Sequence, residues 1–189
     1  HLGAGMPKNE RVTTDFNFFE THFNGFRPFE IAAVAQQGYL ITDPEVLQTI
    51  EEVEQYAKQY AIINGVQSIT MIYKSMHRAY NGDNPAAYLL PEDTSVLHRY
   101  NRDLSRISSS EMQLLLSEDK RYGRISATLS DAGTDSIRMV QSEIQQYINK
   151  LPNQEKVQFT ITGTGIIFDK NTQYLRRNII SGVLLAFLC

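Results

Sequence analysis

Hydrophobic and polar residues alternate along this chain with two different periods, that of a strand and that of a helix. The first apolar run, residues 29–35 (FEIAAVA), lies between a proline and a glycine and is typical of a β-strand. Asp43-Pro44 then predicts the start of a helix, because Asp accepts hydrogen bonds from free amides and Pro suits the first helical position. The apolar residues that follow share one helical face, at Val46, Ile50, Val53, Ala57 and Tyr60.

Asn64-Gly65 favours a helix C-terminus, so the first helix is expected to end there. Residues 66–73 (VQSITMIY) are rich in β-branched and aromatic side chains, which predicts a second strand. Residues 74–121 are instead polar and contain turn signals such as Asn84-Pro85. Short helical patterns interrupt them, with apolar positions at Val96, Leu97, Tyr100, Leu104 and Ile107, and then at Met112, Leu115 and Leu116. We interpret this stretch as an insertion of small helices.

The alternation of strand and helix then returns. Residues 122–129 (YGRISATL) predict a strand, and residues 131–135 predict a turn with capping residues. A helical stripe follows at Ile137, Val140, Ile144, Tyr147 or Ile148, and Leu151. Pro152-Asn153 breaks this helix, and residues 157–162 (VQFTIT) predict the last strand.

These elements form two similar units, each a strand, a helix and a strand, with the helical insertion between them. The order is that of the split βαβ, or ferredoxin-like, arrangement within the α+β class. One antiparallel sheet with two helices on one face buries both apolar stripes. We therefore expect the helices at 43–62 and 134–151 to pack on the same face of one sheet.

Residues 179–189 (IISGVLLAFLC) form an uncharged apolar run directly after Arg176 and Arg177. A helix needs about 20 apolar residues to cross a bilayer, so this run predicts the start of a transmembrane helix in a larger membrane protein. One alternative is an apolar helix packed on its own domain. Arg176 and Arg177 support a second alternative, a cytoplasmic domain with a C-terminal membrane anchor, because positive residues favour the cytoplasmic side of a membrane.

Composition and motifs exclude several kinds of function. The net charge of −3 gives no sign of the positive surface that binds nucleic acid. The single cysteine, Cys189, allows no disulfide or cysteine-based metal site within the chain. The four histidines show no metal-ligand spacing, and we expect His77 and His98 to be solvated or locally bonded. Neither a catalytic set nor a cofactor motif is identifiable, so we expect no enzyme activity and no cofactor.

Aromatic residues gather early in the chain, at Phe16, Phe18, Phe19, Phe23, Phe26 and Phe29. Such rings usually fill a core. A more specific hypothesis is a portal through which a hydrophobic substrate enters near the membrane, because an aromatic surface binds hydrophobic molecules without directional polar groups. The residues proposed for this portal are Phe16, Phe19, Phe23 and Phe26.

Six short segments together resemble an extracytoplasmic loop domain of an RND-superfamily exporter, in the branch of MMPL-like and patched-like proteins. Their order and spacing carry the resemblance, which spans about residues 23–189. They are Gly25-Phe26-Arg27-Pro28-Phe29-Glu30, Asp43-Pro44-Glu45-Val46-Leu47, Gly65-Val66 with Ser68, Tyr80-Asn81-Gly82-Asp83 with Leu90-Pro91-Glu92, and Ile161-Thr162-Gly163-Thr164.

The resemblance implies a multi-pass inner-membrane pump that exports hydrophobic or lipid-like molecules, driven by a proton gradient. Its partners are then the bilayer, the substrate, and the rest of the same chain with a second similar loop domain. The expected organisation is a lead-in at 1–28, a porter-like domain at 29–165 with its insertion at 74–121, and a connecting helix and membrane entry at 166–189. An extracellular ligand-binding or sensor domain of a membrane receptor is the alternative, and a membrane-tethered enzyme is weaker.

Overall fold

Four strands form one antiparallel sheet in the structure of this protein, a computed structural model that describes residues 27–104, 110–130 and 132–162. The strands are β1 (Arg27–Ala35), β2 (Ile63–Gln67), β3 (Tyr122–Leu129) and β4 (Val157–Thr162). The strands expected at 29–35, 122–129 and 157–162 are confirmed, the first with two more residues at its start. Of the lead-in predicted at 1–28, Arg27 and Pro28 instead begin β1. Residues 1–26 and the apolar C-terminal run lie outside the described residues.

The strand order is β2-β3-β1-β4, so β1 lies between β3 and β4. In the register of the sheet, Ile31 of β1 is opposite Ile125 of β3 on one side and Ile161 of β4 on the other. The fold is therefore α+β with a four-stranded antiparallel sheet. Its element order and strand order are compatible with a split βαβ arrangement.

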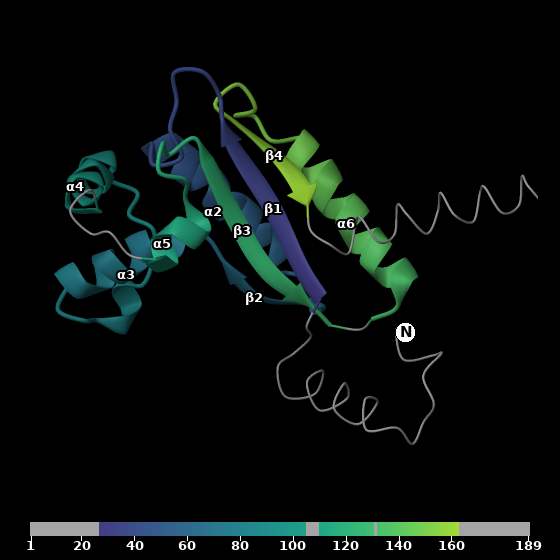
Figure 1. Cartoon of the computed structure of the whole chain (residues 1–189). Helices are drawn as coiled ribbons and strands as arrows, with labels where there is room; N and C mark the ends of the chain where they lie inside the picture. The colour runs from purple at the N-terminus through teal and green to yellow at the C-terminus, as the bar shows by residue number, and fades with distance from the viewer. Residues whose placement is uncertain (1–26, 105–109, 131, 163–189) are drawn as a thin grey trace, which may run out of the picture.

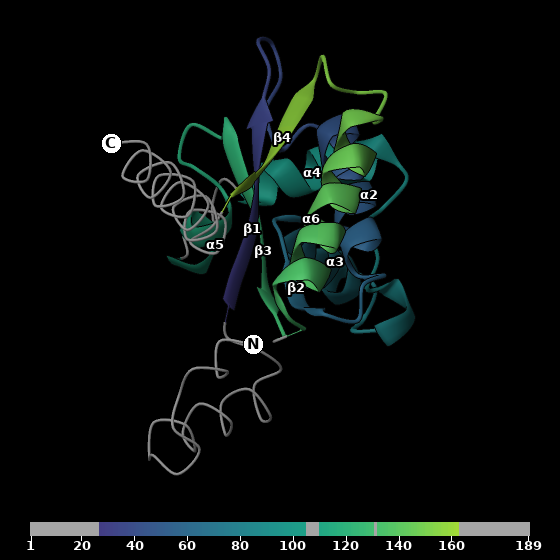
Figure 2. The ribbon, with the colours of Figure 1, turned by 90° about the vertical axis from the view of Figure 1, so that its right-hand side faces the viewer.

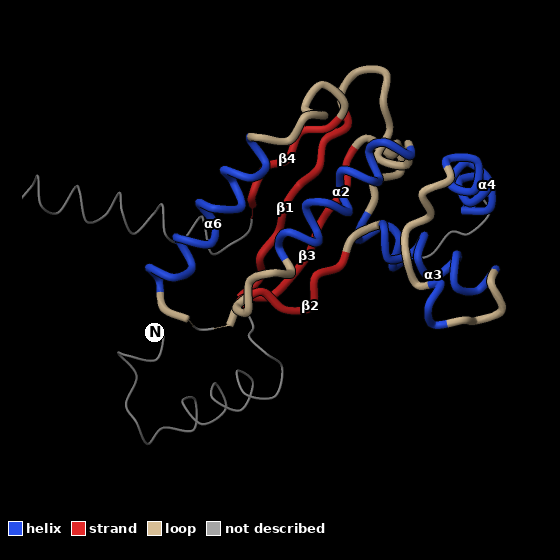
Figure 3. Tube along the Cα trace, turned by 180° about the vertical axis from the view of Figure 1, so that it is seen from behind, coloured by secondary structure: helices blue, strands red, loops and turns tan. Residues whose placement is uncertain are grey.

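Two long helices, α2 (Pro44–Ala57) and α6 (Thr134–Asn149), cover one face of this sheet, as Figures 1 and 3 show. Alternate residues of β1 point toward them, since Phe29, Ile31 and Ala33 are buried in the same core as the apolar stripes of both helices. The rings of Tyr56 on α2 and Tyr147 on α6 stack with centroids 3.8 Å apart. The prediction that both helices share one face of the sheet is thus confirmed.

The segment between β2 and β3 is helical, as the sequence predicted. It contains α3 (Thr70–Tyr80), the 3-10 helix η2 (Pro85–Ala87), α4 (Thr94–Leu104) and α5 (Ser110–Leu115). In Figure 2, α5 lies on the side of the sheet opposite to α2 and α6.

The strand predicted at 66–73 is wrong beyond Gln67, because α3 begins at Thr70. A local hydrogen bond, from the Thr70 amide to the Ser68 hydroxyl at 3.2 Å, turns the chain away from the sheet. Ile69 and Tyr73 then become fully buried one helical turn apart. Tertiary burial at a spacing of four residues overrides the β propensity of this stretch.

The first helix also ends earlier than predicted, at Ala57 instead of Asn64-Gly65. Asn64-Gly65 lies inside β2, where the pairing with β3 is irregular between Asn64 and Gln67 and Gly65 has φ +61°. The expected start at Asp43-Pro44 is confirmed, but the Asp43 carboxylate caps no helical amide. It accepts a hydrogen bond from the amide of Leu40 at 2.8 Å and so closes the turn before the helix.

Candidate functional site

The face of the sheet away from α2 and α6 carries the side chains with the opposite alternation. On β1 these include Glu30 and Ala32, and on β3 they include Tyr122 and Arg124, whereas their neighbours along each strand are buried in the core. Because successive residues of a strand point to opposite faces, this second face is formed by the residues that the core does not use. We call it the open face.

Helix α5 covers one end of the open face. Its C-terminal end is joined to the start of β3 by an isolated bridge between Leu116 and Gly123. The turn between them is closed by two hydrogen bonds of Ser117 with Tyr122, both 2.9 Å long. Leu115 is buried but does not belong to the main hydrophobic core. We infer that Leu115 is buried by contact between α5 and the open face.

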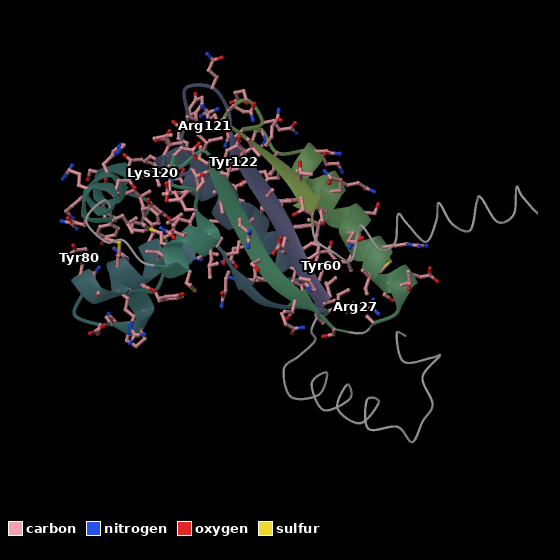
Figure 4. All side chains as sticks on the ribbon, viewed as in Figure 1. Arg27, Tyr60, Tyr80, Lys120, Arg121 and Tyr122 are labelled. Atoms are coloured by element: carbon pink, nitrogen blue, oxygen red, sulfur yellow. The ribbon has the colours of Figure 1, made fainter. Side chains whose placement is uncertain are left out.

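A pocket of about 300 Å³ lies between α5 and the open face, a size at the lower end of small-molecule sites. The strands contribute Glu30, Ala32, Tyr122, Gly123, Arg124 and Thr162, and α5 with the residues after it contributes Gln113, Leu114, Leu115, Leu116 and Ser117. Figure 4 shows Tyr122 at the start of β3, next to Lys120 and Arg121 in the turn. The lining is thus apolar in part, with one cation and one anion.

Two large side chains of this pocket are exposed to solvent, Leu114 at 63% and Tyr122 at 56%. A leucine gains free energy when it leaves water, about 1.5–3 kcal/mol for complete burial. An apolar molecule in the pocket would bury part of both side chains. The pocket can therefore bind a ligand through its apolar surface.

The charged residues of the pocket are Arg124 and Glu30, whose nearest side-chain nitrogen and oxygen are 3.7 Å apart. This distance makes an ion pair but exceeds that of a hydrogen bond. Thr162 adds a hydroxyl, which donates to the backbone oxygen of Glu30 at 3.4 Å. The pocket therefore offers opposite charges beside an apolar wall.

A second polar cluster lies between α2 and α3 and is buried. Glu54, only 2% exposed, accepts hydrogen bonds from the hydroxyls of Thr70 at 2.6 Å and Ser68 at 3.3 Å. Its carboxylate also pairs with Lys58 at 3.0 Å and Lys74 at 3.4 Å. Because Glu54, Ser68, Thr70 and Lys74 are all buried and only Lys58 is exposed, we assign this cluster to holding α3 against α2.

Lys74 also pairs with Glu51, at a distance of 2.5 Å. Burial raises the pKa of the Glu51 carboxyl, but hydrogen bonds from Lys74 and Gln55 outweigh it, so this pKa is lowered from its ordinary value. Glu51 is therefore ionised under ordinary conditions. The cluster thus pairs two glutamate side chains with two lysine side chains.

Of the four histidines, the structure describes His77 and His98, which lie on different helices and have separate surroundings. His77 lies with Nδ1 2.9 Å from the hydroxyl of Tyr100, whose ring stacks on that of Tyr80. His98 is exposed on α4. Within the ranges that the structure describes, no group of three or more His, Cys, Asp or Glu residues is placed to hold a metal ion.

Asp119, in the turn before β3, also has local partners. The carboxylate of Asp119 accepts from the Ser117 hydroxyl at 2.6 Å and from the amide of Arg121 at 3.1 Å. The hydrogen bond from Ser117 is the main reason that the pKa of Asp119 is lowered. Asp119 thus shapes the turn that precedes Tyr122.

The predicted portal residues Phe16, Phe19, Phe23 and Phe26 lie outside the described residues, so the portal stays a prediction. Phe29, the last ring of the same cluster, is buried in the core beneath the helices. The pocket on the open face was missed by sequence reasoning. Two features of the sequence could have indicated it. The alternation in residues 122–129 places Tyr122 and Arg124 on the face opposite the core, and Leu114 to Leu116 form a short apolar run.

No protein-family model matches this sequence, and no curated protein matches it either. Among the helices of the described ranges, none combines the length and apolar character needed to cross a membrane.

Proposed function

We propose that this chain is an extracytoplasmic substrate-path domain of a proton-driven, multi-pass exporter of hydrophobic or lipid-like molecules. The observation that carries the proposal is the pocket on the open face, where apolar side chains lie beside a charged pair. The resemblance to RND-superfamily loop domains and an element order compatible with the split βαβ arrangement support it. In this proposal the fold is ferredoxin-like and the domain faces the periplasm.

The remaining parts of the proposal concern segments beyond the described ranges. Residues 166–189 connect the domain to a membrane helix, and Phe16, Phe19, Phe23 and Phe26 form a portal near the bilayer. The described part of the chain ends at Thr162, which itself lines the pocket. The pocket would then lie on the path between the membrane and the outside.

The exposed Leu114 gives a direct test of this role. In the full-length protein, Leu114→Ser should lower export several-fold, because the pocket loses apolar surface that substrate contacts. Since Leu114 is 63% exposed, its replacement should change stability by no more than about 0.5 kcal/mol. Cells that carry the variant should therefore retain lipid-like molecules at unchanged protein abundance and melting temperature.

Met139 provides the matched control, because it is 58% exposed but lies on α6, away from the pocket. Met139→Ser should leave export unchanged. Equal export by both variants and the unmodified protein would contradict the proposed path. A loss of abundance together with export would instead show that Leu114 acts through folding.

The alternative is a sensor domain that binds the same class of ligand and passes a signal through the membrane. The contact of Thr162 with the pocket favours it, because a bound molecule would touch the last residue of β4. The two functions differ in outcome. A sensor domain would bind the molecule without moving it, so Leu114→Ser would change a cellular response and leave lipid distribution unchanged.

A further inference from the structure

We propose that Glu30 and Arg124 select a zwitterionic head group, and that the occupant of the pocket is a single-chain amphiphile with such a head. The inference deepens the proposed function and rests on it, since it names which lipid-like molecules the pocket accepts. Its observations are the placement of the two charges, their unused hydrogen-bonding capacity, and the apolar wall next to them.

The two charged side chains lie diagonally across neighbouring strands. In the register of the sheet, Ala32 of β1 is opposite Arg124 of β3, and Glu30 is two residues before Ala32. Diagonal neighbours on one face are within reach of long side chains. Both charges therefore project from the floor of the pocket and meet at 3.7 Å.

Both groups keep free bonding capacity toward a ligand. A guanidinium has five N–H donors and a carboxylate has about four acceptor sites. Within the described part of the chain, this ion pair is the only interaction of either charged group, and neither makes a side-chain hydrogen bond. An exposed pair of this length contributes little stability, so a ligand can separate or bridge it without a large loss.

The balance of charge decides which head group fits. An anionic head group would bind Arg124 but be repelled by the like charge of Glu30. A cationic head group would bind Glu30 but be repelled by Arg124. A zwitterion places its negative group on the guanidinium and its positive group on the carboxylate, which satisfies both residues. The hydroxyl of Thr162 can serve as a neutral partner at the same site.

The tail of the amphiphile would lie on the wall formed by α5. Leu114 of α5 and Tyr122 at the start of β3 are exposed at the pocket, and Leu115 of α5 is buried. The volume of about 300 Å³ suits one chain better than a two-chain lipid, because it lies at the lower limit of pockets for drug-sized molecules. Apolar wall and paired charges thus define one class of occupant.

Three probes with the same tail test this inference: dodecylphosphocholine, dodecyl sulfate and dodecyltrimethylammonium, each below its micelle-forming concentration. Binding to the full 189-residue chain is measured by titration calorimetry, and amide shifts at Ala32 and Thr162 locate it. Dodecylphosphocholine should bind about tenfold more tightly than either singly charged probe, because it alone makes both a charge-assisted hydrogen bond from Arg124 to its phosphate and an ionic contact of its trimethylammonium group with Glu30.

The variants should change the order of the probes in opposite directions. Glu30→Gln should make dodecyl sulfate the preferred probe, and Arg124→Gln should make dodecyltrimethylammonium the preferred one. Leu114→Ser should weaken all three. The control pair Arg78→Gln and Asp83→Asn removes an exposed ion pair of 3.9 Å on another part of the surface and should change nothing.

Two results would overturn the inference. One is dodecyl sulfate or dodecyltrimethylammonium binding as tightly as dodecylphosphocholine to the unmodified chain, and the other is an order of probes that Glu30→Gln leaves unchanged. If all three bind equally and Leu114→Ser weakens them, head-group selection fails and the amphiphile pocket stands. If Leu114→Ser leaves the export rate of the full-length protein unchanged, the proposed function itself fails.

Discussion

Replacing Lys74 by Met should destabilise the domain by about 3 kcal/mol, the lower end of the cost of breaking a buried ion pair. Lys74 is 5% exposed and pairs with the carboxylates of Glu51 and Glu54. Its removal leaves both carboxylates without this cation in a site that is largely shielded from water. Lys58, Ser68 and Thr70 still contact Glu54, which is why we expect the lower end of the range. Urea denaturation at pH 7 measures this loss as a lower free energy of unfolding.

Arg78→Met is the matched control, since Arg78 lies one turn further along α3 and its side chain is 46% exposed. Its effect should stay within about 0.5 kcal/mol, as is usual for surface substitutions. Equal effects of the two variants would show that burial of the pair around Lys74 does not matter for stability.

The same cluster predicts the direction of the pH dependence. Because the pKa of Glu51 is lowered below the ordinary value of 4.5 in the folded state, its ionised form stabilises the domain fully above that pH. The stabilisation is lost as pH falls through the folded pKa. The difference in stability between the unmodified chain and Lys74→Met should therefore shrink between pH 7 and pH 3. A difference that grows over this range would contradict the assignment.

Truncating Tyr73 should have the largest effect of any single change we consider, about 3–5 kcal/mol for Tyr73→Ala by analogy with other large aromatic residues. Its ring is fully buried on α3. Its hydroxyl donates to Asn101 on α4, whose amide donates in turn to the backbone oxygen of Thr42 at 2.8 Å. Tyr73 thus connects the helical segment to the body of the domain. Thermal and chemical unfolding of the purified chain measure the effect.

Two further variants separate the ring from its hydroxyl. Tyr73→Phe keeps the packing and should cost only about 1 kcal/mol, the net value of one hydrogen bond. Tyr88→Ala removes a tyrosine that is 46% exposed and should be nearly neutral. If Tyr73→Ala is no worse than Tyr88→Ala, α3 is not part of the core as described.

Tyr73 also shows where sequence reasoning reached its limit. The run from Val66 to Tyr73 has strand composition, yet Ile69, Tyr73 and Met76 recur at helical spacing. Composition and periodicity disagreed, and the burial of Ile69 and Tyr73 is accompanied by a long-range contact, since the buried carboxylate of Glu54 accepts from Ser68 and Thr70. A contact between residues 14 and 16 positions apart is not visible in a local pattern.

The rest of the sheet followed from the pattern because one face of each strand is buried. In β1 and β3 the buried core side chains alternate with half-buried or exposed ones, so the face of each strand that packs on the core was predictable. The helices α2 and α6 were predictable for the same reason, since their apolar stripes match the 3.6-residue period. Local periodicity is therefore sufficient to predict a strand or helix and its buried side where one whole face of the element is buried.

The pocket could not be predicted in the same way. It depends on α5 folding back over the open face, which the bridge between Leu116 and Gly123 fixes. The turn at residues 117–122 carries hydrogen bonds of Ser117 and Asp119 and a Lys120 with φ +57°. The sequence showed neither that turn nor the approach of Glu30 to Arg124.

Photo-cross-linking from position 122 in the full-length protein tests the central claim most directly. Tyr122 lines the pocket and is exposed, so benzoylphenylalanine can replace it without loss of a core contact. The same residue at position 139 on α6 serves as the control. After illumination in cells, mass spectrometry should find a lipid-like adduct at position 122 and none at position 139. Equal labelling at both positions, or no lipid-like adduct at position 122, would contradict the account.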